Sequence, residues 1–175
     1  MTEEHDELIP AGGVIEDAFG RIRQLVEDLT TGTSTATLAH RPTPEANSMA
    51  WLIWHLTRVQ DTHIAELANQ PTVWESDGWA DRFDLSLDRD ATGYGATPAE
   101  VAALDGTAAE DLDGYHHDVH AMTLRYVRTL DEDALEQVVD RSWDPPVTAA
   151  ARIVSVISDC LQHAGQAAYV RGLQG

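Results

Sequence analysis

Apolar residues recur at helical spacing along most of this chain, and no segment shows the strict apolar–polar alternation of a half-buried strand. The helical pattern covers four segments, at residues 14–29, 47–68, 97–130 and 147–171. A chain without strands can bury its apolar stripes only by packing helix on helix. The sequence therefore predicts an all-α fold, a four-helix bundle.

The ends of these segments carry residues that start or break helices. Asn47 or Ser48 can cap the second segment, and residues 97–100 (Thr-Pro-Ala-Glu) have the order of a capping box with proline in the first turn. Gly106 and Gly114 are two points at which the third helix could break. We therefore expect well-defined starts for the second and third helices.

Two connections separate the later helices. Residues 69–96 form a long irregular stretch between the second and third helices, and a loop of this length in a compact domain is usually functional. Residues 131–144 form a connector that we expect to hold a short helix at residues 133–138. The length of 175 residues fits one domain with a real core. We expect a single helical domain over residues 1–175, with residues 1–12 as a flexible acidic tail.

The charge of the chain limits its partners. The formal net charge is −19, and all 11 basic residues are arginine. Such a surface repels nucleic-acid phosphates and anionic membrane surfaces, so neither is expected as a partner. No apolar run approaches the length of a membrane span, and the N-terminus does not resemble a secretory signal. With Cys160 as the single cysteine, these features favour a cytoplasmic location.

The last helical segment contains two residues that are out of place in an apolar helix. Asp159 and His163 are four residues apart, so their side chains stack on one face, one turn apart. A carboxylate in an apolar helix is costly unless it is paired or bound to a metal ion, and a histidine one turn away is a natural co-ligand. This spacing suggests half of a metal site.

His55 is the best third ligand. It lies among apolar residues in the second helix, in line with Leu52, Val59 and either His63 or Ile64. Bundles build metal sites from inward side chains of facing helices. Two imidazole nitrogens and one carboxylate oxygen suit one divalent ion, first of all Zn²⁺ or Ni²⁺, and leave coordination positions open for water or substrate.

Other interpretations of the same residues remain open. A histidine on an apolar face can be a hydrogen-bonded core residue, and Asp159 can pair with Arg152. A rival pair, His116 and His120, also has i, i+4 spacing, but we expect it on a solvated face. Cys160 points about 100° away from Asp159, so we expect it to be a small core residue.

The chain resembles the DinB superfamily of metal-binding bundles. The resemblance is carried by Trp-Leu-Ile-Trp-His-Leu at residues 51–56, by the late run from Asp159 through His163 to Gln166, and by Tyr-Val-Arg-Gly at residues 169–172. Within the superfamily the chain looks closest to actinobacterial members related to mycothiol-dependent maleylpyruvate isomerase and thiol S-transferases. Many members have histidine at the position of Asp159, and the isomerase branch has glutamate, so the aspartate departs from both.

The resemblance implies a metal-dependent enzyme that uses a low-molecular-weight thiol, such as mycothiol as cosubstrate, to transfer sulfur to a small electrophile or to isomerise it. It implies His55, Asp159 and His163 as metal ligands, with a homodimer as a further expectation. Candidate substrate-binding residues are Gln166, Arg82, Arg152 and Trp51, and residues 74–83 could cover the pocket. The alternatives are a metal-binding or stress-response protein without turnover, a metal-free bundle and a metal-dependent hydrolase.

Overall fold

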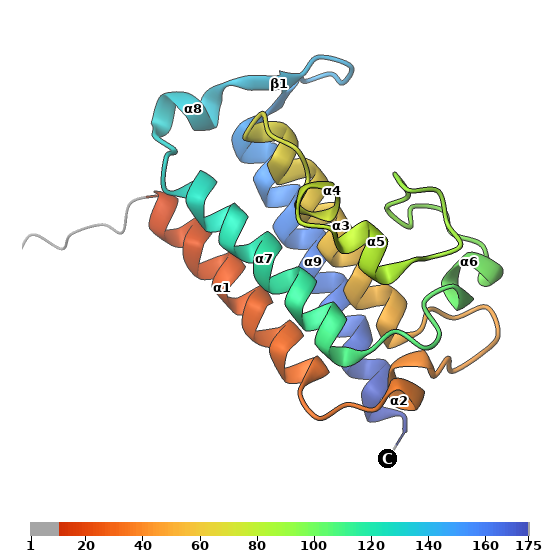
Figure 1. Ribbon diagram of the computed structural model, residues 1–175. Coiled ribbons are helices and arrows are strands. Elements are labelled where there is room, and N and C mark those ends of the chain that lie inside the picture. Colours follow the sequence, from red (N-terminus) through yellow and green to blue (C-terminus); the bar gives the residue numbers. More distant parts are fainter. Residues whose placement is uncertain (1–10, 175) are drawn as a thin grey trace, which may run out of the picture.

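Four long helices form the body of the protein in the computed structural model, which describes residues 11–174. They are α1 (Ala11–Thr30), α3 (Met49–Leu67), α7 (Ala109–Val127) and α9 (Ala149–Gly172) (Figure 1). Helix α3 packs against α7 and α9, and α1 packs against the same two helices from the opposite corner. The predicted all-α four-helix bundle is confirmed. Among the described residues, no helix combines the length and the hydropathy that a membrane crossing needs.

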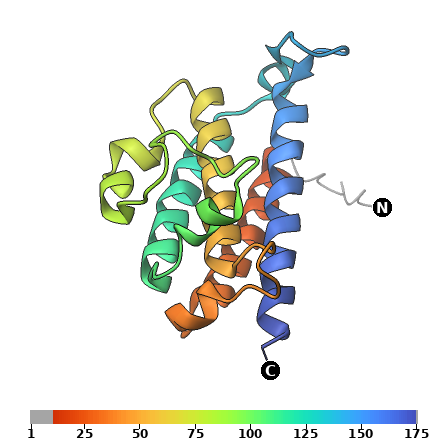
Figure 2. The same cartoon turned by 90° about the vertical axis from the view of Figure 1, so that its right-hand side faces the viewer.

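The direction of the helices explains the long connections. Helices α1 and α9 run one way, and α3 and α7 run the other way (Figures 1 and 2). Because consecutive helices α3 and α7 are parallel, the chain must return along the whole bundle between them. That return contains α4 (Val73–Ser76), α5 (Trp79–Phe83) and α6 (Pro98–Ala102), while the shorter α2 (Thr35–Ala39) lies between α1 and α3.

Two helices differ from the sequence-based expectation, and two predicted helix starts are confirmed. Helix α1 already includes Ala11, so the part of the expected acidic tail that is described is helical, and residues 1–10 lie outside the described residues. The third predicted helix is two helices, because Gly106 at φ +92° separates α6 from α7. The Ser48 cap and the capping box at Thr97 are both present.

A small hairpin was not predicted. Helix α8 (Glu132–Glu136) is followed by β1 (Val138–Asp140), which pairs antiparallel with β2 (Val147–Thr148) next to the start of α9 (Figure 1). The short helix expected at residues 133–138 therefore ends earlier, and its last residue belongs to a strand. Strands of two or three residues are too short to show the alternation of apolar and polar residues by which a strand is recognised in a sequence.

The segment with Trp74 and Phe83 packs on the side of α7. Both rings contact the ring of buried Tyr115, with centroids 5.2 and 5.9 Å away. The carboxylate of buried Asp61 holds the start of this segment, because it accepts hydrogen bonds from the backbone amides of Val73 and Trp74, both at 2.8 Å. The aromatic side chains of residues 74–83 therefore pack onto the core around α7, and the segment is not the cover expected over the pocket.

The expectation that His116 lies on a solvated face is wrong. His116 is fully buried, and neither ring nitrogen has a hydrogen-bond partner among the described residues. Burial lowers the pKa of His116 well below its usual range, and the nearby Arg23 guanidinium adds to this effect. No third ligand joins His116 and His120 among the described residues, so this pair is not a metal site in the structure.

Replacing His116 by leucine is expected to stabilise the fold by about 1–2 kcal/mol near neutral pH, because an unpaired polar ring is replaced by an apolar side chain. The gain should grow in acid. The pKa of His116 is lower in the folded state, so the unfolded chain binds more protons below about pH 6.5 and the wild type loses stability there. Urea unfolding at several pH values measures this. Exposed His117→Leu is the control, and an unchanged pH slope in His116→Leu would contradict the account.

Candidate metal centre

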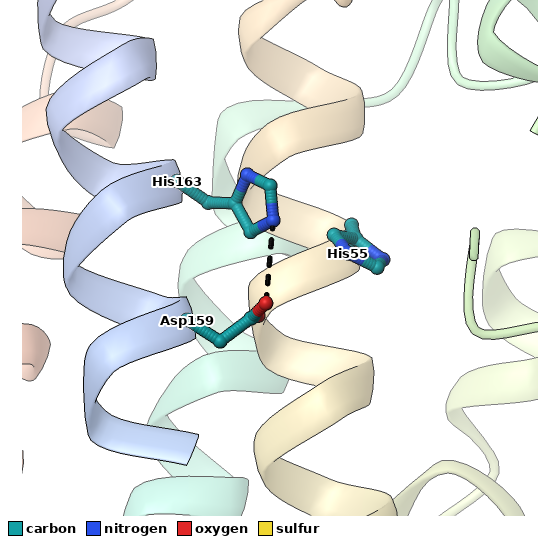
Figure 3. A group of neighbouring side chains, drawn as sticks. All are labelled: His55, Asp159 and His163. Atoms are coloured by element: carbon teal, nitrogen blue, oxygen red, sulfur yellow. Dashed lines mark ion pairs between the residues drawn. The ribbon is translucent and has the colours of Figure 1, made fainter. Parts of the chain in front are cut away.

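Three side chains from two helices meet at one point of the bundle. Figure 3 shows Asp159 and His163, one turn apart on α9, directed toward His55 on α3. One ligand atom from each residue lies within 4.8 Å of the others, and the rings of His55 and His163 are 4.7 Å apart between centroids. Buried Cys160 and Ala164 occupy the same stretch of α9, and the Cys160 thiol donates to the Leu56 carbonyl at 3.5 Å. Small residues here let the helices approach closely.

The ring of His55 is held from outside the bundle. Its Nδ1 lies 2.5 Å from the carbonyl oxygen of Thr92, which can only accept, so Nδ1 carries the proton and Nε2 has a free lone pair. The ring also stacks on Trp51 at 4.6 Å between centroids. A hydrogen bond from the distal nitrogen to a carbonyl is the usual way in which proteins orient a metal-binding histidine.

His163 is oriented in the same way from its own helix. Its Nδ1 lies 3.0 Å from the amide oxygen of Gln166, so the proton belongs on Nδ1 and Nε2 faces Asp159 at 3.6 Å from the carboxylate. The Asp159 carboxylate raises the pKa of His163, and His163 lowers the pKa of Asp159. Burial lowers the pKa of His55. Without a cation, Asp159 and His163 therefore favour each other's charged form, whereas burial favours the neutral form of His55.

The donor set fits a divalent cation. The second oxygen of Asp159, Oδ2, is buried without a hydrogen-bond partner among the described residues, which is costly unless a cation binds there. Two ligand atoms on a tetrahedral Zn²⁺ lie about 3.4 Å apart when each bond is about 2.1 Å. The separations here are up to 4.8 Å, so small side-chain rotations would bring the three atoms to that spacing.

Cavities lie on both sides of the cluster along the α3–α9 groove. A cavity of about 440 Å³, lined by Asp159, His63 and Arg152 among others, lies toward the start of α9. A second cavity of about 680 Å³, lined by Gln166, Asn47 and Tyr169 among others, lies toward its end. Asp159 itself lines the smaller cavity, whereas the larger cavity is connected to the cluster through Gln166, which contacts His163.

A model of the mycothiol-S-transferase family, a DinB-like family, matches residues 14–175. The chain belongs to the mycothiol-S-transferase family. A solved structure described as the conserved protein of locus from Enterococcus faecalis shares 30% sequence identity, with a TM-score of 0.87 over 94% of this chain and 96% of that chain. No curated protein matches the sequence. The resemblance to the DinB superfamily is thereby confirmed.

Of the candidate substrate-binding residues, three lie at or near the metal cluster and one lies elsewhere. Trp51 packs against the His55 ring, and Gln166 contacts His163. Arg152 lines the smaller cavity, where it contacts His63. Arg82 lies elsewhere, on α5, where it pairs with Asp111 and covers the ring of Trp79.

Sequence reasoning missed the backbone segment that orients His55. Gly93 follows Thr92 and has φ +92°, and a Cβ atom there would lie 2.9 Å from His55 Nδ1. Only glycine lets the chain pass this close to the imidazole in this conformation. A glycine in a long loop was the only signal, and it does not by itself indicate what the backbone approaches.

Gly93→Ala should weaken metal binding by about tenfold to a hundredfold, because the new methyl group pushes the Thr92 carbonyl away from His55 and releases the ring. Gly95→Ala is the matched control. Gly95 also has positive φ, at +70°, but a Cβ atom there meets nothing within 4 Å. Competition titration against a chelator measures both affinities. Equal affinities in the two variants would show that the Thr92 contact does not orient the ligand.

Proposed function

We propose that the protein is a divalent-metal-dependent thiol S-transferase that uses mycothiol or a similar thiol as cosubstrate and conjugates it to a small electrophile. The main support is that His55, Asp159 and His163 converge and that the Nδ1 atoms of both imidazoles contact an oxygen, which leaves both Nε2 atoms free to bind a cation. Membership of the mycothiol-S-transferase family supports the choice of thiol. Three protein ligands, rather than four, are typical of catalytic metal sites.

In this proposal His55, Asp159 and His163 hold one divalent ion, Zn²⁺ or Ni²⁺ by the donor set. A bound cation would lower the pKa of a thiol beside it, so that the thiolate is available at neutral pH. The Thr92 carbonyl and the Gln166 amide keep the two imidazoles in the binding tautomer.

The larger cavity suits the thiol. It is lined by the amides of Asn47, Gln162 and Gln166 and by the ring of Tyr169, which together offer hydrogen bonds and a flat face to a polyhydroxylated molecule. Gln166 uses its oxygen on His163 and keeps its amide N–H groups for such a ligand. The thiol would then lie on one side of the cluster and the electrophile on the other.

The test is a conjugation assay with Zn²⁺-loaded protein, mycothiol and the fluorogenic electrophile monobromobimane. Wild type should accelerate conjugation, and His163→Ala should lose both the ion and the acceleration. His117→Ala, an exposed histidine on α7, should behave as wild type. If His163→Ala keeps its metal and its activity, the proposal is wrong. A metal-loaded wild type that conjugates no thiol would instead indicate a metal-binding protein without turnover.

Three further expectations stay predictions: a single domain over residues 1–175, a cytoplasmic location and a homodimer. The homodimer can be measured directly by light scattering coupled to size exclusion. It does not enter the proposed chemistry, because all three candidate ligands come from one chain.

A further inference from the structure

The smaller cavity beside Asp159 contains a chain of hydrogen bonds that the metal centre does not use. One guanidinium nitrogen of Arg152, Nη1, lies 3.0 Å from Nδ1 of His63, and the other, Nη2, lies 3.2 Å from a carboxylate oxygen of Asp140. His63 comes from α3, Arg152 from α9 and Asp140 from β1, so three elements meet here. All three residues line the cavity together with Asp159.

These contacts determine which nitrogen of His63 carries its proton. Two groups lie beside Nδ1 of His63: the Arg152 guanidinium at 3.0 Å, which can only donate, and the Glu66 carboxylate, which is farther away at 3.8 Å. Nδ1 therefore accepts from the nearer Arg152, and the proton of the neutral ring is on Nε2. This is the opposite tautomer to that of His55 and His163, whose Nδ1 atoms donate to oxygen. Nε2–H of His63 has no hydrogen-bond partner among the described residues, and the side chain is about one-third exposed at the cavity.

The charges of the cavity do not favour an anionic ligand. Arg152 carries the one positive side chain among the lining residues, and its charge is balanced by Asp140 at 3.2 Å. Asp159 adds a second carboxylate. The other walls include Val59, Val147 and the ring of Trp143. A neutral molecule with an apolar or aromatic part and one hydrogen-bond acceptor matches this lining better than a carboxylate does.

We infer that this cavity is the electrophile subsite, that it takes a neutral, oxygen-bearing electrophile such as an aryl epoxide, and that His63 donates its Nε2–H to the reacting oxygen. The inference rests on the proposed thiol-transferase function. The thiol loses its proton to solvent, the thiolate sulfur forms a bond to an epoxide carbon, and the C–O bond breaks. The electron pair goes to oxygen, which accepts the hydrogen bond from His63 and is then protonated by solvent.

In this scheme Arg152 is a positioning residue. It acts through His63, because it holds Nδ1 as an acceptor and thereby keeps the donor on Nε2. This changes the role expected for Arg152 from binding a substrate directly to fixing the tautomer of His63. Removing the guanidinium should therefore change the ring nitrogens of His63 in the metal-free protein as well.

Two readouts test the inference. In ¹⁵N NMR spectra of metal-free protein, His63 should be the Nε2–H tautomer, and its Nε2–H signal should move on addition of acetophenone but not of ethylbenzene or benzoate. Arg152→Leu should abolish this preference for one tautomer. An Nδ1–H tautomer in wild type, or no response to acetophenone, would overturn the inference whether or not the protein transfers thiols.

The second readout compares two substrates of similar shape in the loaded enzyme with mycothiol. Styrene oxide develops charge on oxygen, whereas benzyl chloride loses chloride. His63→Leu should lower kcat/KM for styrene oxide by about tenfold to a hundredfold more than kcat/KM for benzyl chloride, and His63→Gln, which keeps an N–H donor, should restore most of that difference. Equal losses with both substrates would make His63 structural and overturn the inference. A wild type that conjugates neither substrate, while acetophenone still moves the His63 signal, would contradict the proposed thiol-transferase function but would support a subsite in which His63 binds an oxygen atom.

Discussion

Replacing Asp159 by asparagine is expected to lower the affinity for Zn²⁺ by roughly a hundredfold or more, with little change in stability. The two side chains have nearly the same shape, but the amide lacks the charge that binds the cation. Structural zinc sites with four ligands bind with about 10–16 kcal/mol, which is about 2.5–4 kcal/mol per ligand and corresponds to about 60-fold to 700-fold. A chelator competition titration of wild type and Asp159→Asn measures the difference.

Asp159→Glu provides the control for this prediction. It keeps the carboxylate and adds one methylene group, so it should bind the ion within about tenfold of wild type if the helix can accommodate the longer side chain. Asp159→Asn should also remove the interaction that raises the pKa of His163, so NMR titration of His163 should show a lower pKa in the metal-free variant. Wild-type affinity in Asp159→Asn would mean that Asp159 is not a ligand.

Replacing Asp61 by alanine is expected to destabilise the protein by about 3–5 kcal/mol. Its carboxylate accepts from the backbone amides of Val73 and Trp74 and from the Tyr115 hydroxyl, each at 2.8 Å, and it is fully buried. Alanine leaves these donors without partners and leaves the nearby Arg58 guanidinium, 3.7 Å away, without its counter-charge.

Urea unfolding followed by circular dichroism measures the effect of Asp61→Ala. Asp105→Ala is the matched control, because Asp105 is exposed and its side chain makes no hydrogen bond to the described residues. The control should stay within about 0.5 kcal/mol of wild type. A loss below about 1 kcal/mol in Asp61→Ala would contradict the view that this carboxylate anchors the long connection between α3 and α7.

Much of the fold could be predicted because helices are local structures. The apolar period of 3.6 residues and the caps at Ser48 and Thr97 lie within a few residues of the elements they define. The features that the sequence did not predict depend either on contacts between distant residues or on segments too short to show a period. The break at Gly106 was one of two open choices, and the hairpin depends on pairing between residues 138–140 and 147–148, which are too few to show a period.

Part of the candidate site could also be predicted from local sequence patterns. His55, Asp159 and His163 stood out as polar residues on apolar helix faces, and the antiparallel packing of α3 on α9 brings them together. The contact of Thr92 with His55 and the contact of Arg152 with His63 link residues 37 and 89 positions apart, and no local pattern predicts them. The sequence left open whether His63 or Ile64 continues the inward face of α3. In the structure Ile64 is buried in the core, and His63 lines the smaller cavity.

The central claim is that His55, Asp159 and His163 hold one divalent ion. It is tested most directly by plasma mass spectrometry on protein purified without a metal-affinity tag, with wild type beside His55→Ala. We predict about one divalent ion per chain in wild type, lost in the variant. A wild type without metal, even after incubation with Zn²⁺ or Ni²⁺, or a His55→Ala variant that retains a full equivalent, would contradict the claim.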